Sequence, residues 1–337
     1  MKATSHMQRP VARFISLALL CLPTIVLAQL LPGEAPVTIT AIDNVVAAGS
    51  NWELVWADFE TADGIIGTPD GGVLFAQEQT DTIRRLDANG KEYVYMTDVH
   101  GPGSVSIDNS GRMFTVQRTC TDPGKPFFQS CAELTKVVQL APEFRVLAAG
   151  FADGRPLGRL NDLIVDGRGG AYFTVGGAFH VSAAGVVSVV EDQNLRSNGI
   201  MLSRDGRTLY VTNDTVVLAF DVAADGSTSN RRDFVTLAGD NGGDGMAIDN
   251  EGRLYITGNK GVHVASEAGE YLGLIPTHRR PITLAFAGPD KDILYAPSMG
   301  AIGPDGKAWT TPEGVRNTAM TIYRLRMLSK GYDGRPK

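Results

Sequence analysis

Several motifs that would mark a common class of protein are absent from this sequence. There is no Gly-x-Ser-x-Gly elbow and no His-Glu-x-x-His motif, which argues against a serine hydrolase or a zincin peptidase. No amphipathic helical pattern follows the N-terminal residues, and no Trp-Asp dipeptide supports a WD40 repeat. Charged residues make up 20% of the chain and hydrophobic residues 43%, which is typical of a globular protein and excludes a disordered or coiled-coil chain.

Long apolar runs are also absent, except for one near the N-terminus. Residues 14–28 form a continuous apolar run after three basic residues, with small residues at Val26 and Ala28. The run is shorter than the ~20 residues that a membrane helix needs, so it predicts a cleaved signal peptide over residues 1–28. We expect a secreted, periplasmic protein without a membrane anchor after cleavage. Removal of the three basic residues takes the net charge from −6 to −9, so we expect no nucleic-acid partner.

Cysteine is scarce, and its placement also indicates export. Apart from Cys21 in the apolar run, the chain has only Cys120 and Cys131, which enclose a segment with proline and glycine. No histidine lies near them, so the pair does not have the pattern of a metal site. We expect a Cys120–Cys131 disulfide that holds this loop in an oxidising compartment, the alternative being two unrelated free thiols.

Glycine is in excess, with 39 residues or roughly 12% against a usual ~7%. Many of these glycines belong to a pattern that occurs six times. Each copy has a short apolar strand, a polar turn with glycine, and a second strand with an aromatic residue or leucine. The copies begin at Gly64, Ser104, Leu163, Ile200, Met246 and Ile282. Most copies are followed by one or two further strands.

Six units of about four strands predict an all-β fold, a six-bladed β-propeller over residues 51–330. A barrel or a sandwich would not repeat a four-stranded unit six times. We expect Thr321–Met327 to pair into a blade that also contains N-terminal residues, because this closes the ring without an exposed strand edge. Residues 29–50 are either a linker or part of this outer-strand closure.

Polar residues recur at the start of the first strand in four of the six copies. They are Asp63, Asn161, Asn198 and Asp244, whereas copies two and six have Gly103 and Ile282. Because the first strand of each propeller blade lines the central channel, the four side chains should meet at one channel mouth. The alternative is that the Asp-Gly and Asn-Gly pairs are turns. A turn device should recur in all six copies, so the pattern favours a functional ring.

Oxygen donors without cysteine or histidine suit one hard divalent cation, with Ca²⁺ first and Mg²⁺, Mn²⁺ or Zn²⁺ as alternatives. Such a cation polarises a carbonyl group and lowers the pKa of bound water, and a neighbouring carboxylate can accept the proton. The histidines are scattered along the chain. His100 lies three residues before Gly103, near the same mouth, and is a candidate substrate contact.

Five segments, in this order, resemble the SMP-30/gluconolactonase/LRE family. They are ADGIIGTPDGG (62–72), GRLNDLIVDGRGGAYFT (158–174), SNGIMLSRDGRTLYVTND (197–214), GDGMAIDNEGRLYITGNKGVHV (243–264) and ITLAFAGPDKDILYA (282–296). The resemblance extends from about Asp58 to Met327. It implies a six-bladed propeller that hydrolyses a lactone, such as a sugar lactone, with a divalent metal.

The resemblance also implies roles for individual residues. Asp63, Asn198 and Asp244 match the metal ligands of the family, and Asp244 is in addition the candidate base. Asn161 matches an asparagine that lies by the metal and the substrate. Arg159 matches an arginine that contacts the sugar in some members.

Two positions depart from the family pattern. The first ligand is usually Glu, and Asp63 is shorter by one carbon–carbon bond, about 1.5 Å. Either the metal sits nearer the first blade, or a water bridges, or Asp63 is not a direct ligand. Thr283 stands in a region where the family often has Asn.

Two rival functions stay open: a non-catalytic propeller that binds a sugar or a protein around a structural metal, and a lyase or isomerase that uses the same metal site. The sequence does not define an oligomeric state.

Overall fold

The computed structural model describes residues 1, 30–120, 131–191, 195–300, 310–311, 314–315 and 319–334. One compact unit extends from Leu31 to the C-terminus, and all the secondary structure described below lies in it. The predicted signal peptide over residues 1–28 lies outside the described residues, apart from Met1. No helix in the described part of the chain is long and apolar enough to span a membrane.

The unit consists of six four-stranded antiparallel sheets, here called blades 1 to 6. Blade 1 has the strands β2 (Asp63–Gly67), β3 (Val73–Gln77), β4 (Thr82–Leu86) and β5 (Glu92–Met96), with the 3-10 helix η1 (Glu78–Thr80) after β3. Blade 2 has β6 (Ser106–Ile107), β7 (Met113–Gln117), β8 (Lys136–Ala141) and β9 (Arg145–Ala148). Blade 3 has β10 (Leu163–Val165), β11 (Ala171–Thr174), β12 (Ala178–Val181) and β13 (Val187–Glu191).

The second half of the ring repeats this order. Blade 4 has β14 (Ser197–Leu202), β15 (Thr208–Asn213), β16 (Val216–Val222) and β17 (Thr228–Thr236). Blade 5 has β18 (Met246–Ile248), β19 (Leu254–Thr257), β20 (Gly261–Ala265) and β21 (Tyr271–Pro276). Blade 6 has β22 (Ala285–Ala287), β23 (Ile293–Met299), β26 (Ala319–Arg326) and β1 (Glu53–Ala57). A small two-stranded sheet joins β24 (Thr310–Thr311) and β25 (Gly314–Val315).

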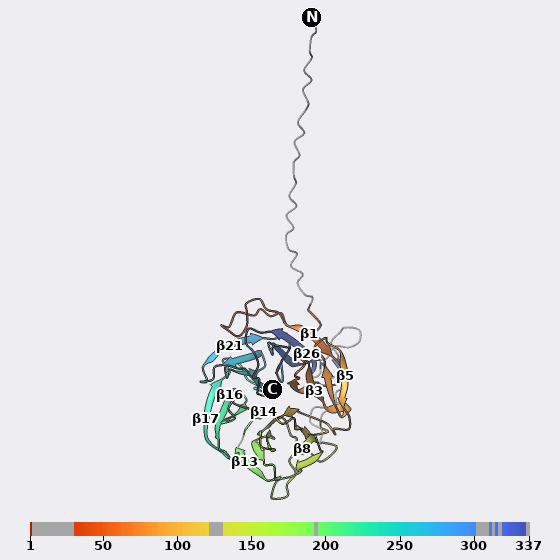
Figure 1. Cartoon of the computed structure of the whole chain (residues 1–337), viewed down its shortest axis with the longest axis vertical. Coiled ribbons are helices and arrows are strands. Elements are labelled where there is room, and N and C mark those ends of the chain that lie inside the picture. Colours follow the sequence, from red (N-terminus) through yellow and green to blue (C-terminus); the bar gives the residue numbers. More distant parts are fainter. Residues whose placement is uncertain are drawn as a thin grey trace. The chain divides into compact units, whose positions relative to one another are not determined.

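The blades surround a central axis, as Figure 1 shows, with β14 nearest that axis and β17 at the rim in blade 4. First strands of neighbouring blades contact one another, including β2 with β22, so the ring is closed. The predicted six-bladed propeller of four-stranded blades is therefore confirmed.

Blade 6 closes the ring with strands from both halves of the chain. β26 pairs with β23 on one side and with β1 on the other, with Glu53 opposite Arg324. The Arg324 guanidinium donates two hydrogen bonds to the Glu53 carboxylate, at 2.8 and 2.9 Å. The predicted pairing of the 321–327 segment with N-terminal residues is confirmed.

Aromatic side chains of the second strands fill the space between blades. Every blade has at least one such buried residue: Phe75, Phe114, Tyr172 with Phe173, Tyr210, Tyr255 and Tyr295. Their large apolar area stabilises the contact between wedge-shaped blades. Residues before β1 extend the same core, because Ile39, Ile42, Val45 and Val46 are buried against blades 5 and 6.

Candidate functional site

A small cavity lies where the chain enters the first strands. It is lined by all four residues of the predicted ring, Asp63, Asn161, Asn198 and Asp244, together with Asp162 and Thr283. It has room for about one water-sized occupant. The four side chains come from blades 1, 3, 4 and 5, which shows that their shared position in the repeat brings them to one place.

The glycines that follow three of these residues are not turn glycines. None of Gly64, Gly199 and Gly245 has a positive φ. A Cβ on Gly64 would lie 2.1 Å from the Ser104 Cα, and a Cβ on Gly199 would lie 2.1 Å from the Asp244 carbonyl oxygen. Each glycine therefore allows the first strands of two neighbouring blades to approach closely, and the interpretation as turns is wrong.

Buried threonines at the ends of second strands hold the backbone of the ring. Thr174 Oγ1 donates to the Asn198 carbonyl at 2.5 Å, across the boundary between blades 3 and 4. Thr257 Oγ1 donates to the Gly245 carbonyl at 3.0 Å. These bonds fix the main chain at Asn198 and Asp244, so both side chains are presented from a rigid support.

Asp244 and Asn198 are the two ring residues whose side chains lack hydrogen-bond partners within the described residues. The nearest cation to the Asp244 carboxylate is Arg280, with Nη2 4.0 Å from Oδ2. Burial, followed by the negative charge of Asp63, raises the pKa of Asp244 to about 8, and the Arg280 charge opposes this rise. Burial and the neighbouring Asp63 therefore disfavour a bare charged carboxylate at Asp244.

Asp63 differs from them because a buried arginine binds it. Arg118 Nη2 donates to Asp63 Oδ2, and Nε donates to Glu78 Oε2 at 3.0 Å. Arg118 Nη1 donates to the Leu160 carbonyl at 2.9 Å and to Asn161 Oδ1 at 3.2 Å. One guanidinium group therefore joins blades 1, 2 and 3 at the ring, and it uses oxygen atoms of two predicted site residues.

Arg118 stays charged in this setting. Burial by itself lowers the pKa of its guanidinium, but the charges of Glu78 and Asp63 raise it above its ordinary value. Gly103 provides the space, since a Cβ there would lie 2.5 Å from Arg118 Nε. The sequence interpretation missed Arg118 and Glu78. The signal in the sequence that could have indicated Arg118 is its position, as a charged residue directly after the apolar strand β7.

Arg159 and His100 differ in their relation to the cavity. The Arg159 side chain is exposed at the surface. Partial burial of the side chain is the larger cause that lowers the pKa of its guanidinium, and the positive charge of Arg118 is the next. The charges of Glu78, Asp63 and Asp244 oppose that shift, so Arg159 lies within electrostatic reach of the ring. His100 does not line the cavity; its exposed ring lies 3.4 Å from the Glu133 carboxylate. Its role as a substrate contact stays a prediction.

The predicted disulfide between Cys120 and Cys131 is present. Its half-cystine Cys120 lies two residues after Arg118, and the Cys120 N–H donates to Glu78 Oε1 at 2.7 Å. The disulfide is therefore attached to the same buried cluster that holds Asp63.

Replacing both Cys120 and Cys131 by Ser should lower the free energy of unfolding by roughly 2–4 kcal/mol. The physical reason is that the cross-link constrains the unfolded chain. Urea unfolding with and without reductant measures the effect, and reductant should destabilise the wild type but not the variant. Identical unfolding of both proteins under non-reducing conditions would contradict the prediction.

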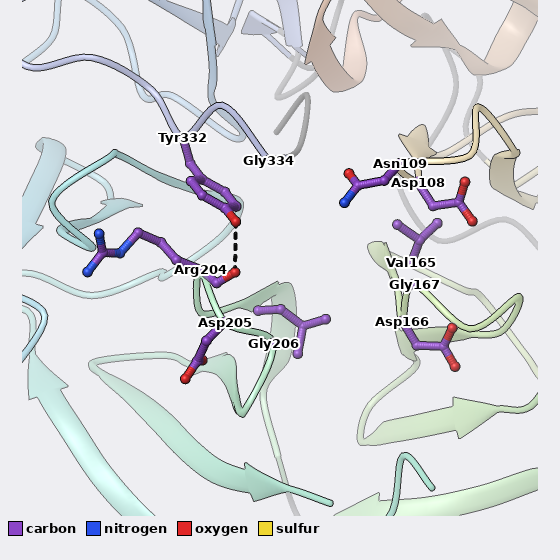
Figure 2. Close-up of a pocket in the computed structure, with 11 residues that line it drawn as sticks. Asp108, Asn109, Val165, Asp166, Gly167, Arg204, Asp205, Gly206, Tyr332 and Gly334 are labelled. Carbon is purple, nitrogen blue, oxygen red and sulfur yellow. Dashed lines mark hydrogen bonds between the residues drawn. The ribbon is translucent and has the colours of Figure 1, made fainter. Parts of the chain in front are cut away.

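A second, larger cavity lies at the other ends of the first strands. Turns of blades 2, 3 and 4 line it, together with Tyr332, whose hydroxyl donates to the Arg204 carbonyl at 3.0 Å. The carboxylates of Asp108 and Asp166 point away from Arg204 and Tyr332 (Figure 2), and each is bonded within its own blade. Because its acidic groups are already partnered, this cavity is a poorer candidate site than the ring.

The ring is suited to a hard cation. Within the described residues no three His, Cys, Asp or Glu side chains gather into a metal site, so amide oxygens would have to complete the donor set. The Asn198 amide and the Asp244 carboxylate line one cavity without hydrogen-bond partners among the described residues, and a divalent cation there would stabilise the charged form of Asp244. These residues fit the cation that the sequence analysis predicts.

Comparison with known proteins gives matches of three kinds. Residues 129–300, just over half of the chain, match the SMP-30/Gluconolactonase/LRE-like region. Pentonolactonase XacC of Haloferax volcanii is 30% identical over 187 residues, which are 51% of this chain and 64% of XacC. Regucalcin of Xenopus laevis is 29% identical over 255 residues, which are 68% of this chain and 79% of regucalcin.

The likeness extends to solved structures. A gluconolactonase from Xanthomonas campestris superimposes with a TM-score of 0.65 at 16% sequence identity, covering 88% of this chain and 97% of that one. At this identity the superposition supports the fold alone. The family match over residues 129–300 is stronger evidence than this superposition, because it covers more than half of the chain. The chain therefore belongs to the SMP-30/gluconolactonase/LRE-like family.

Proposed function

We propose that this protein hydrolyses a lactone, with a sugar lactone as the substrate class, and that it does so with one divalent cation. The observation that carries the proposal is the convergence of Asn198 and Asp244 on one cavity, both without hydrogen-bond partners within the described residues. The names of relatives support the reaction class, since they include a pentonolactonase and two lactonohydrolases of Aspergillus oryzae. The matched region spans less than two thirds of each of these three relatives.

Asn198 and Asp244 are the residues that would hold the cation, and hard oxygen donors favour Ca²⁺. When bound, the cation would polarise the lactone carbonyl and lower the pKa of water beside it. Of the three alternatives for the short first ligand, the contact with Arg118 supports the one in which Asp63 is not a direct ligand. Asp63 then serves the site through Arg118 and through its charge.

The chain's own groups account for the proton transfers. Asp244 accepts a proton from the water molecule that attacks the carbonyl carbon. The bond between that carbon and the ring oxygen then breaks, and Asp244 returns the proton that it accepted to the ring oxygen, which becomes a hydroxyl group. Arg159, which is exposed and within electrostatic reach of the ring, would hold a hydroxyl or carboxylate group of the substrate.

A pH-stat assay on a panel of aldonolactones, with and without EDTA, tests the proposal. We expect acid release that EDTA abolishes and that Ca²⁺ restores. Sugar binding without acid release would favour a non-catalytic binding propeller. Conversion of a cyclic substrate without uptake of water would favour a lyase or an isomerase.

Replacing Asn198 by Ala should raise the dissociation constant of the cation by at least ~10–100-fold. Removing a residue that only hydrogen-bonds to a metal ligand typically has an effect of that size on metal affinity. Asn198 would be a ligand itself, so its loss should have at least this effect. Isothermal titration with Ca²⁺ measures the constant directly, and added Ca²⁺ should restore part of the activity. Unchanged Ca²⁺ affinity would show that Asn198 is not a ligand.

We further propose that the protein acts outside the cytoplasm, in the periplasm. The disulfide between Cys120 and Cys131 supports this location, because disulfides persist in oxidising compartments. The N-terminal basic and apolar pattern supports it as well.

A further inference from the structure

Blade 6 contributes neither Asp nor Asn to the ring, but it contributes a hydroxyl group. Thr283 lines the same cavity as Asp244, and only 4% of the residue is exposed. Its Oγ1 atom is buried and has no hydrogen-bond partner within the described part of the chain. Burying a hydroxyl group without a partner costs free energy, so a partner supplied by a ligand is expected.

The backbone around Thr283 is fixed, and its hydroxyl group therefore has a defined position. The Ile282 N–H donates to the Pro297 carbonyl at 2.8 Å, and the Ile282 carbonyl accepts from the Gly245 N–H at 2.7 Å. A Cβ on Gly245 would lie 2.5 Å from Thr283 Oγ1. The hydroxyl group thus lies against the Asp244–Gly245 segment, and any larger residue at position 245 would displace it.

We infer that Thr283 is a substrate-binding residue whose hydroxyl group donates a hydrogen bond to the one hydroxyl or carbonyl oxygen of the lactone that enters the cavity, which has room for a single water-sized group. The inference rests on the proposed function, since it concerns the same site. Thr283 belongs to blade 6, whereas Asn161 and Arg159 belong to blade 3, which is three blades away in the ring of six. Thr283 therefore adds a contact from the opposite side of the ring. A neutral donor there suits an uncharged polar oxygen of the substrate.

Thr283→Val is the decisive variant, because valine has nearly the shape of threonine without the hydroxyl group. We expect kcat/KM for the best aldonolactone to fall about 10-fold, the loss of one hydrogen bond. The melting temperature of the free protein should stay the same or rise, because an unpartnered buried hydroxyl group is removed. Thr283→Ser keeps the hydroxyl group and should keep kcat/KM within about 3-fold of wild type.

Ser104 offers a matched control. Its hydroxyl group is also buried and without a partner among the described residues, but Ser104 does not line the cavity. Ser104→Ala should therefore leave kcat/KM unchanged. A kcat/KM of Thr283→Val within 2-fold of wild type would overturn the inference, as would a melting temperature lowered by several degrees.

Three outcomes separate this inference from the proposals on which it rests. If Thr283→Val loses Ca²⁺ affinity by titration and regains full kcat/KM at saturating Ca²⁺, the hydroxyl group is a cation ligand and the inference is wrong. A wild-type protein that releases no acid from any lactone would overturn the proposed function, and the inference with it. An active wild type with an equally active Thr283→Val would overturn the inference alone.

Discussion

Replacing Asp244 by Asn should lower kcat by ~10²–10⁴-fold, the usual contribution of general-base catalysis. Asparagine keeps an oxygen donor toward the cation but cannot accept a proton at neutral pH. Steady-state kinetics at saturating Ca²⁺ measure the effect. The loss should appear in kcat and kcat/KM together, because the proton moves only in the transition state.

Asp205→Asn is a control with the same change of charge, at the other end of the first strands, where Asp205 lines the larger cavity. It should leave kcat near the wild-type value. A kcat for Asp244→Asn within a few-fold of wild type would show that Asp244 is not the base, and the chemistry would then rest on the cation.

The same substitution should stabilise the metal-free protein. The pKa of Asp244 in the folded state, about 8, lies above its ordinary value, so the folded protein resists losing this proton as the pH rises. The destabilisation of the fold by Asp244 therefore grows as the pH rises from roughly 4 to 8 and is full above that range, and asparagine removes it. We expect the gain in melting temperature to be larger at pH 8 than at pH 5.

Replacing Arg118 by Met should lower the free energy of unfolding by about 3–5 kcal/mol, because two carboxylates lose their buried counter-charge. Both the Arg118 and the Glu78 side chains are only 2% exposed, so water cannot replace the lost contacts. Thermal and urea unfolding measure the loss. Arg118→Lys keeps the charge but cannot reach Asp63, Glu78 and the Leu160 carbonyl together, so it should recover only part of the stability.

The triple variant Arg118→Met, Asp63→Asn, Glu78→Gln provides the control for charge. If the loss comes from uncompensated carboxylates, neutralising both should restore much of the stability. A loss below about 1 kcal/mol for Arg118→Met, the size typical of an exposed pair, would show that the cluster is hydrated. Release of Asp63 from Arg118 should also make its carboxylate available to a cation, which Ca²⁺ titration of the Arg118→Met protein would detect.

The fold and the four residues of the ring can be predicted from local patterns in the sequence. Asp63, Asn161, Asn198 and Asp244 have the same position relative to repeated strands, so a periodic pattern places them together without knowledge of the structure. The closure by Thr321–Met327 follows from the same repeat, since one blade lacks an outer strand until the N-terminal residues are added.

The remaining part of the site depends on contacts that no local pattern reveals. Arg118 meets Glu78, 40 residues earlier, and the Leu160 carbonyl, 42 residues later, only because three blades converge. Thr283 was recognised as a departure from the family pattern, but its unpartnered hydroxyl group depends on side-chain packing. The Asp-Gly pairs were ambiguous because the close approach of neighbouring strands, like a turn, demands glycine.

The pairing of β26 with both β23 and β1 has a consequence for how the chain is made. Nearly all of the protein must leave the ribosome before β26 can pair with β1 and β23, which are synthesised earlier. Until then β1 and β23 have unpaired edges, which are sites of aggregation and chaperone binding. The ring therefore closes as a late, single event, and a polypeptide cut short before residue 319 would have all the residues of the candidate site but no completed ring to hold them.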